Sequence, residues 1–290
     1  MQLDLFADSR DVMLRNDVLD ALQRRHACDA RQAWERLTGE YPADDTAPML
    51  AVLISAIENL PTARFVSHPA LAEARRVLAD EIAPAARRLL GEQAAGAWLV
   101  PCWRTLAQRA AALPFDADSS DHHAAPVWLQ AGDWDAAKQA VERIASWRRI
   151  PASLAWMTEA RYRADGLDLA WPLLTELAWL APVRCVALIS RLGDVSLDAL
   201  RKQFDAQFIG TGELTDFAWF PAWLLTVKPG LADRLREAQL SRHVDPERAT
   251  SMLLQILSLE RQGRHHDLIE RRQALRDLHG GLYAAYMKTR

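Results

Sequence analysis

The residues best suited to carry out chemistry are gathered in one acidic stretch. Three carboxylates and two imidazoles fall within a few positions of each other, namely Asp116, Asp118, Asp121, His122 and His123. Carboxylate oxygens and imidazole nitrogens are ligands of divalent metals, so the stretch 116–123 could serve an all-α enzyme or metal protein. Adjacent histidines rarely converge on one ion without a scaffold, however, and a solvated loop explains the same composition. We therefore expect a solvated linker that binds no specific metal.

Other short motifs whose spacing carries a mechanism are missing from the chain. The sequence has no Gly-x-Ser-x-Gly elbow, no phosphate-binding glycine-rich loop, no His-Glu-x-x-His and no Cys-x-x-Cys. Its three cysteines, Cys28, Cys102 and Cys185, are an odd number and lie far apart, which favours neither a disulfide framework nor a paired-thiol metal site. The sequence thus predicts a non-enzymatic protein that uses no cofactor or metal.

Composition and charge are those of a folded protein. Half of the 290 residues are hydrophobic and a quarter are charged, and the net charge is -3, which gives no support for direct nucleic-acid binding. The first residues lack the basic region and long apolar core of a secretion signal. The apolar stretch 177–189 is interrupted by Pro182 and Arg184 before it could span a bilayer. We expect a cytoplasmic protein that contacts no membrane.

Apolar periodicity indicates helices nearly everywhere and no convincing strand. The expected helices are one from about Val12 to Leu22, then 30–37, 47–59, 69–80, 84–94, 95–113, 183–192, 196–207, 214–227, 231–241, 247–262 and 266–278, with helical hairpins at 126–147 and 152–180 and a short cap at 282–290. We expect Asn16 to act as a local cap, Pro101 to bend or restart its helix, and Asp245 to accept free amides at a helix start.

The longest expected loop suggests how the chain is organised. Residues 114–126 are rich in Pro, Asp and Ser, so the best candidate junction between subdomains lies there. The predicted organisation is N-terminal hairpins at 1–113, the loop, and repeats at 127–290. Because a helical array can grow without a domain boundary, one continuous solenoid over 8–290 is the alternative.

Two similar turn sequences are separated by 34 residues. The stretch Gly-Asp-Trp-Asp-Ala-Ala at 132–137 returns as Gly-Leu-Asp-Leu-Ala-Trp at 166–171, and aromatic residues Trp128 and Tyr162 precede the two turns. This spacing is the period of a helix-turn-helix array, and the turn, the small residue Ala137 and the aromatic positions resemble the tetratricopeptide repeat. The later intervals between glycines drift away from that period, so we expect an irregular array.

The resemblance implies an all-α architecture, an irregular right-handed α-α superhelix or solenoid of tetratricopeptide-like hairpins. Gly132 and Gly166 should lie in turns that join antiparallel helices, with Ala137 and Tyr162 at buried contacts. Such an array presents an extended surface to other molecules. The implied function is a protein–protein interaction scaffold or adaptor whose partner is a protein or peptide.

Aromatic residues are dense in the second half of the chain. Large aromatic side chains commonly fill the gaps between packed helices. A second interpretation is that some of them line a groove for the partner. The candidates for that groove are Phe217, Trp219, Phe220 and Trp223.

The N-terminal peptide suggests a more specific role. Gln2, Leu3, Asp4, Leu5 and Phe6 resemble the pentapeptide by which many bacterial DNA polymerases and repair proteins dock on the sliding clamp. An extended segment can place its last two side chains in an apolar pocket while the glutamine amide sets the register by hydrogen bonds. This hypothesis makes the chain a bacterial, clamp-docking accessory protein of DNA replication or repair. In the alternative, the three apolar side chains fold back and cap the first hairpin.

Overall fold

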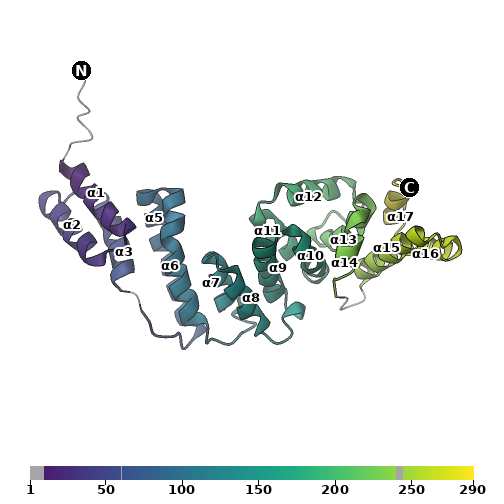
Figure 1. The fold of residues 1–290 in the computed structure, drawn as a ribbon, viewed down its shortest axis with the longest axis horizontal. Coiled ribbons are helices and arrows are strands. Elements are labelled where there is room, and N and C mark those ends of the chain that lie inside the picture. Colours follow the sequence, from purple (N-terminus) through teal and green to yellow (C-terminus); the bar gives the residue numbers. More distant parts are fainter. Residues whose placement is uncertain (1–9, 60, 240–243) are drawn as a thin grey trace, which may run out of the picture. The chain divides into compact units, whose positions relative to one another are not determined.

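The computed structural model describes residues 10–59, 61–239 and 244–290, so the pentapeptide at 2–6 lies outside the described residues. In this part of the chain every regular element is a helix and there is no strand (Figure 1). The helices pack mainly on their neighbours along the chain, as expected for an array of helical hairpins. The prediction of an all-α solenoid of hairpins is confirmed.

The chain divides into two compact units, residues 1–136 and 137–290. The helical segments of the first unit are α1 (Arg10–Gln23), α2 (Ala27–Glu40), α3 (Ala47–Glu58), α4 (His68–Arg76), η1 (Val77–Ile82), α5 (Ala83–Leu90), α6 (Glu92–Ala110), η2 (Ser120–His122) and α7 (Ala124–Gln130). The division falls inside α8 (Trp134–Glu142), after the loop in which the sequence suggests the junction.

The first unit is built on an apolar stripe repeated in each helix. Leu14, Val18 and Leu22 recur every four residues along α1, so they share one helical face, and all three are buried. This face packs on α2, and α2 packs on α3. Asn16 lies on the opposite, exposed side in the middle of α1 and is not the expected cap. Buried side chains of these three helices belong to one hydrophobic cluster that continues through α6 to Val127 of α7.

Proline has less effect on the first unit than the sequence predicts. Pro101 lies inside α6, which continues past it from Glu92 to Ala110, so the helix does not restart there. The gap expected between 80 and 84 is also absent, because the π-helical segment η1 joins α4 directly to α5. The Ala83 N–H bonds to the carbonyl of Leu78, five residues back, just before Pro84. A wide turn of this kind absorbs the irregularity that a proline without an N–H introduces.

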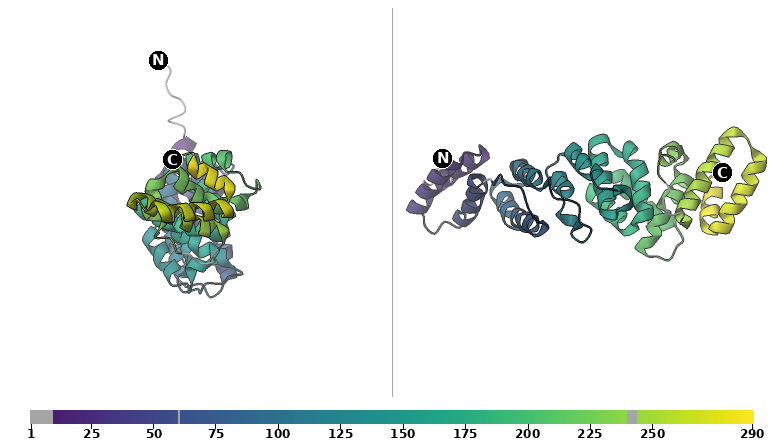
Figure 2. Two further views of the ribbon diagram at one scale, coloured as in Figure 1. Left: turned by 90° about the vertical axis from the view of Figure 1, so that its right-hand side faces the viewer. Right: turned by 90° about the horizontal axis from the view of Figure 1, so that it is seen from below.

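The helical segments of the second unit follow α8. They are η3 (Trp147–Arg149), α9 (Pro151–Asp165), α10 (Leu167–Leu180), α11 (Pro182–Leu192), α12 (Val195–Gln207), η4 (Leu214–Trp219), α13 (Phe220–Val227), η5 (Pro229–Leu231), α14 (Ala232–Leu235), α15 (Asp245–Gln262), α16 (His265–Leu278) and α17 (Gly280–Met287). The last three pack in sequence, and α15 and α16 lie side by side (Figure 1, Figure 2).

Both repeat glycines occupy turns between consecutive helices, and a packed hairpin, as predicted, is found at Gly166. Gly132 lies between α7 and α8 with φ +70°, and Gly166 lies between α9 and α10 with φ +85°, where L side chains are strained. The helices that flank Gly166 pack against each other as a hairpin. Ala137 is fully buried, as expected. Tyr162 is only partly buried, because its hydroxyl reaches outward and donates to Asp194 Oδ2 at 2.7 Å.

Two segments of the second unit are less regular than the periodicity predicts. The expected helix at 214–227 is divided into the 3-10 segment η4 and the helix α13, which begins just before Pro221. The expected helix at 231–241 is limited to η5 and the short α14. The helix start at residue 245 is confirmed, but the Asp245 carboxylate pairs with Arg248 at 3.0 Å and does not cap the helix.

Candidate protein-binding surface

A tight turn between α12 and η4 is organised by one carboxylate. Asp216 accepts hydrogen bonds from Thr211 Oγ1 at 3.0 Å and from the Gly212 N–H at 2.8 Å. A side chain at Gly210 would collide with the same carboxylate, and Gly212 has φ +83°. Both glycines are therefore required by the geometry, and the turn at 208–213 is held in one conformation.

This turn exposes an apolar side chain. Ile209 is 81% exposed, and Leu214 at the far end of the turn is 59% exposed. Phe208 is half-buried and its ring stacks on Phe204 at 4.8 Å between centroids. We call Phe208 and Ile209 together the ridge. Contiguous apolar side chains held in solvent mark surfaces that bind other molecules.

A cavity lies on each side of the ridge, and both residues of the ridge line both cavities. The first cavity has a volume of about 510 Å³, and its other lining residues include Arg201, Asp205, Glu213, Leu214 and Asp216. The second has a volume of about 780 Å³. Its lining includes the apolar residues Trp223, Val227, Leu282 and Ala285, the uncharged polar residues Gln203, Gln207, Thr226 and Thr289, and Lys288. We call them the acidic cavity and the apolar cavity. Their volumes are those of protein pockets that take ligands or side chains, roughly 300 to 1,000 Å³.

The two cavities differ in charge. Three carboxylates and one guanidinium line the acidic cavity, and the Arg201 guanidinium lies 3.5 Å from the carboxylate of Asp205. Lys288 is the charged residue among the described residues that line the apolar cavity. The surface therefore carries negative charge on one side of the ridge and positive charge on the other.

The wall formed by α17 is fixed by a polar network. His279 caps α17 by accepting the Leu282 N–H at 3.0 Å, and its ring packs on Trp219 at 4.5 Å between centroids. At the other end of α17, the buried hydroxyl of Tyr286 donates to Glu260 and accepts from Arg272 Nε at 2.9 Å. Burial, and then the bond to Glu260, raise the pKa of Tyr286. These bonds hold α17 against α15 and α16, so the apolar cavity has a rigid wall.

The aromatic residues predicted to line a groove lie mainly in the interior. Phe217, Phe220 and Trp223 are buried and pack around Phe204, with ring centroids 5.5 to 5.7 Å from it. Phe217 contributes to the lining of the acidic cavity and Trp223 to that of the apolar cavity, whereas neither lining includes Trp219 or Phe220. Most of the ring surface of this cluster is therefore buried by packing of the rings on one another, and only Phe217 and Trp223 of the four candidates reach a cavity.

Ile209 was not predicted from the sequence. It follows the last turn of α12 and falls outside the helical period, so an amphipathic pattern gives it no role. The sequence does contain a signal, which is an apolar residue directly before Gly210 and Gly212 in a turn. Turns carry binding residues disproportionately when a rigid scaffold positions them.

Most of the acidic stretch at 116–123 is exposed or half-buried, as expected of a solvated loop, but its last residue, His123, is buried. His123 is 6% exposed, and its Nδ1 accepts the Ala125 N–H at 3.2 Å to cap α7. Burial, and then the neighbouring His68, lower the pKa of His123 to about 4. His68 donates to the Pro114 carbonyl at 3.0 Å, so the stretch is tied to α4. Within residues 10–59, 61–239 and 244–290, no three His, Cys, Asp or Glu side chains are arranged to hold a metal ion.

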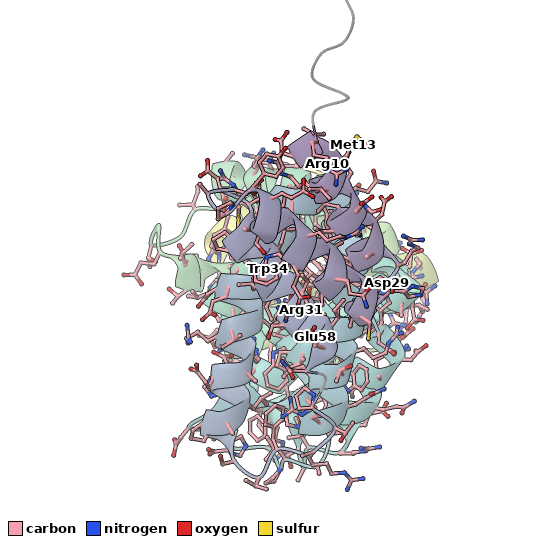
Figure 3. The ribbon with its side chains drawn as sticks, turned by 90° about the vertical axis from the view of Figure 1, so that its left-hand side faces the viewer. Arg10, Met13, Asp29, Arg31, Trp34 and Glu58 are labelled. Carbon is pink, nitrogen blue, oxygen red and sulfur yellow. The ribbon has the colours of Figure 1, made fainter. Side chains whose placement is uncertain are left out.

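Two arginines of the first hairpin are paired with carboxylates. Arg31 lies between Trp34 and Glu58, 2.9 Å from the carboxylate and 5.3 Å from the ring centroid (Figure 3). Arg10, at the start of α1, forms two hydrogen bonds with Glu40 at 3.0 and 3.1 Å. Arg10 thus pairs α1 with α2, and Arg31 pairs α2 with α3.

Comparison of the chain with models of known protein families, with curated proteins and with solved structures returns no match. Within the described residues, none of the helices combines the length and the apolar character needed to cross a bilayer.

Proposed function

We propose that the chain is a non-enzymatic protein–protein interaction scaffold built from divergent, tetratricopeptide-like hairpins. The observation that carries this proposal is the ridge, an apolar pair held out by a rigid turn between two cavities. Ile209 stands between two cavities and beside Phe208, so a partner seated there would remove its apolar surface from water. The repeat assignment rests on the 34-residue spacing of Gly132 and Gly166. Placement in the bacterial cytosol is part of the same proposal.

The test is to capture partners through the ridge in the native cell. A photo-crosslinking amino acid at position 209 should form specific adducts with a protein, whereas the same amino acid at position 269 should not. Ile269 is a matched control because it is also an isoleucine in the second unit and is 68% exposed on α16. Adducts at both positions alike, or at neither, would contradict a scaffold that works through this surface.

A second function, docking on the bacterial sliding clamp, is supported by an independent feature. The pentapeptide Gln2–Phe6 matches the clamp-binding pattern at every position and precedes α1 by only a few residues. The peptide lies outside the described residues, so the support for docking is this sequence match.

Clamp docking predicts a binding loss without a stability loss. Replacing Leu5 and Phe6 together by Ala would remove two apolar anchors of about 1.5 to 3 kcal/mol each, enough to abolish a modest complex. Binding of purified sliding clamp to the intact chain and to this variant can be measured by calorimetry, with thermal unfolding in parallel. If the intact chain does not bind and the variant melts at lower temperature, the peptide is a structural cap.

A further inference from the structure

The surface around the ridge also restricts the kind of partner that fits it. We infer that it binds an amphipathic helix of another protein, with basic side chains facing the acidic cavity and an acidic side chain near Lys288. This inference rests on the proposed scaffold function. It adds the secondary structure and the charge pattern of the partner.

The shape of the surface favours a helix over an extended peptide. The described part of the chain has no strand, so an extended peptide could not gain affinity here by adding a strand to a sheet edge. A helix instead presents side chains three and four residues apart on one face, about 5 to 6 Å from each other, with a groove between them. The ridge fits such a groove, and side chains on its two sides can enter the two cavities.

The ridge is also preorganised for such a contact. Asp216 fixes the turn by its bonds to Thr211 and Gly212, and Phe208 is stacked on the buried Phe204. A side chain that is already held in place loses little freedom on binding. Ile209 is therefore suited to be the central anchor, surrounded by contacts that exclude water.

The charged residues that line the two cavities determine which charges the partner helix should carry on its two sides. Asp205, Glu213 and Asp216 line the acidic cavity against a single Arg201, so the lining attracts cations. The side chain of Asp205 is 55% exposed, so a partner can reach it. On the other side of the ridge, Lys288 lies at the apolar cavity and attracts an acid. Complementary charge of this kind selects partners and sets their orientation.

The experiment selects helices directly and does not require the cellular partner to be identified first. A displayed library of helix-forming peptides with randomised faces is selected on the immobilised full chain. The affinity of the enriched peptides is then measured by fluorescence anisotropy. The expected sequences have apolar residues at i, i+3 or i+4 and i+7, with Lys or Arg on one flank. Ile209→Asp should weaken binding by about tenfold or more, whereas Ile269→Asp should not change it.

A charge reversal tests the flanks separately. Glu213→Lys should weaken the enriched peptides several-fold, with a loss that shrinks as salt is raised. Glu270→Lys is the matched control, since it lies on α16, which contributes to neither cavity lining. Circular dichroism and thermal unfolding of each variant establish that it is folded, which the exposure of Ile209 leads us to expect.

Three results would overturn the inference. These are no enrichment of helical sequences, equal binding of the enriched peptides to the Ile209→Asp and Ile269→Asp variants, and a ridge-dependent dimer by light scattering. The last outcome would identify the occupant as a second copy of this chain. If position 209 still crosslinks a cellular protein while the library yields no helix, the scaffold proposal stands and the helical partner does not.

Discussion

At the scale of single residues, the conformation of the ridge depends on the absence of a side chain at position 210. Gly210→Ala should destabilise the second unit, because the added methyl group meets the Asp216 carboxylate that holds the turn. Overpacking of this kind costs about 1 to 3 kcal/mol. Urea unfolding followed by tryptophan fluorescence measures the loss. Gly230→Ala is the control, since nothing lies within 4 Å of a methyl group there. Equal stability of the two variants would mean that the turn tolerates the methyl group.

A buried histidine makes the first unit sensitive to acid. The pKa of His123 is lowered to about 4 by burial, from the ordinary value of 6.5. Above pH 6.5 the ring is neutral in both states and the full stability is present. As the pH falls from 6.5 to about 4, the unfolded chain takes up a proton that the folded chain excludes, so stability is lost at up to about 1.4 kcal/mol per pH unit.

His123→Asn tests this dependence, because asparagine can still cap α7 but does not titrate. The free energy of unfolding of the variant, measured from pH 7.5 to 4.5, should fall less steeply than that of the unchanged chain. His266→Asn, on α16, controls for the general effect of acid on other groups. Identical slopes for the His123→Asn variant and the unchanged chain would contradict this role of the histidine.

At the scale of elements, one hydrogen bond connects two hairpins. Asp194 caps α12 by accepting the Leu197 N–H at 2.9 Å, and it also accepts the Tyr162 hydroxyl of α9 at 2.7 Å. Asp194→Ala should cost about 1 to 2 kcal/mol, and Tyr162→Phe about 0.5 to 1.5 kcal/mol. The double variant should cost less than the sum, because both changes remove the same bond. Strict additivity in urea unfolding would show that the bond contributes nothing; Asp194→Asn, which keeps the cap, is the control.

The sequence predicts the elements better than it predicts their ends and irregular turns. The sequence places Gly132 and Gly166 in turns correctly, because glycine is the residue that adopts a positive φ without strain. Asn16 does not cap a helix because it lies in the middle of α1, on the face opposite the buried stripe of Leu14 and Val18. Pro101 does not break α6, contrary to the prediction, because α6 is stabilised by packing on α5 and on α7. The burial of His123 depends on contacts with residues distant in sequence such as His68, and the exposure of Ile209 depends on the geometry of one irregular turn, and helical periodicity predicts neither.

At the scale of the whole molecule, the division into two units predicts that the first can fold alone. Its core includes Val127 of α7, and its boundary falls within α8. A chain ending at Glu142 should therefore be helical and unfold cooperatively by circular dichroism. A chain ending at Ala110 lacks α7 and should be markedly less stable. Non-cooperative unfolding of the longer fragment would mean that the first unit depends on the second.

The exposed isoleucine of the ridge has a consequence for the amount of protein in the cell. A chain that outnumbers its partner displays an apolar anchor, and chaperones and proteases act on such surfaces. A chain whose Ile209 is covered by a bound partner does not expose this side chain to chaperones and proteases. We therefore expect the steady-state level of the protein to follow the level of its partner, with the surplus degraded.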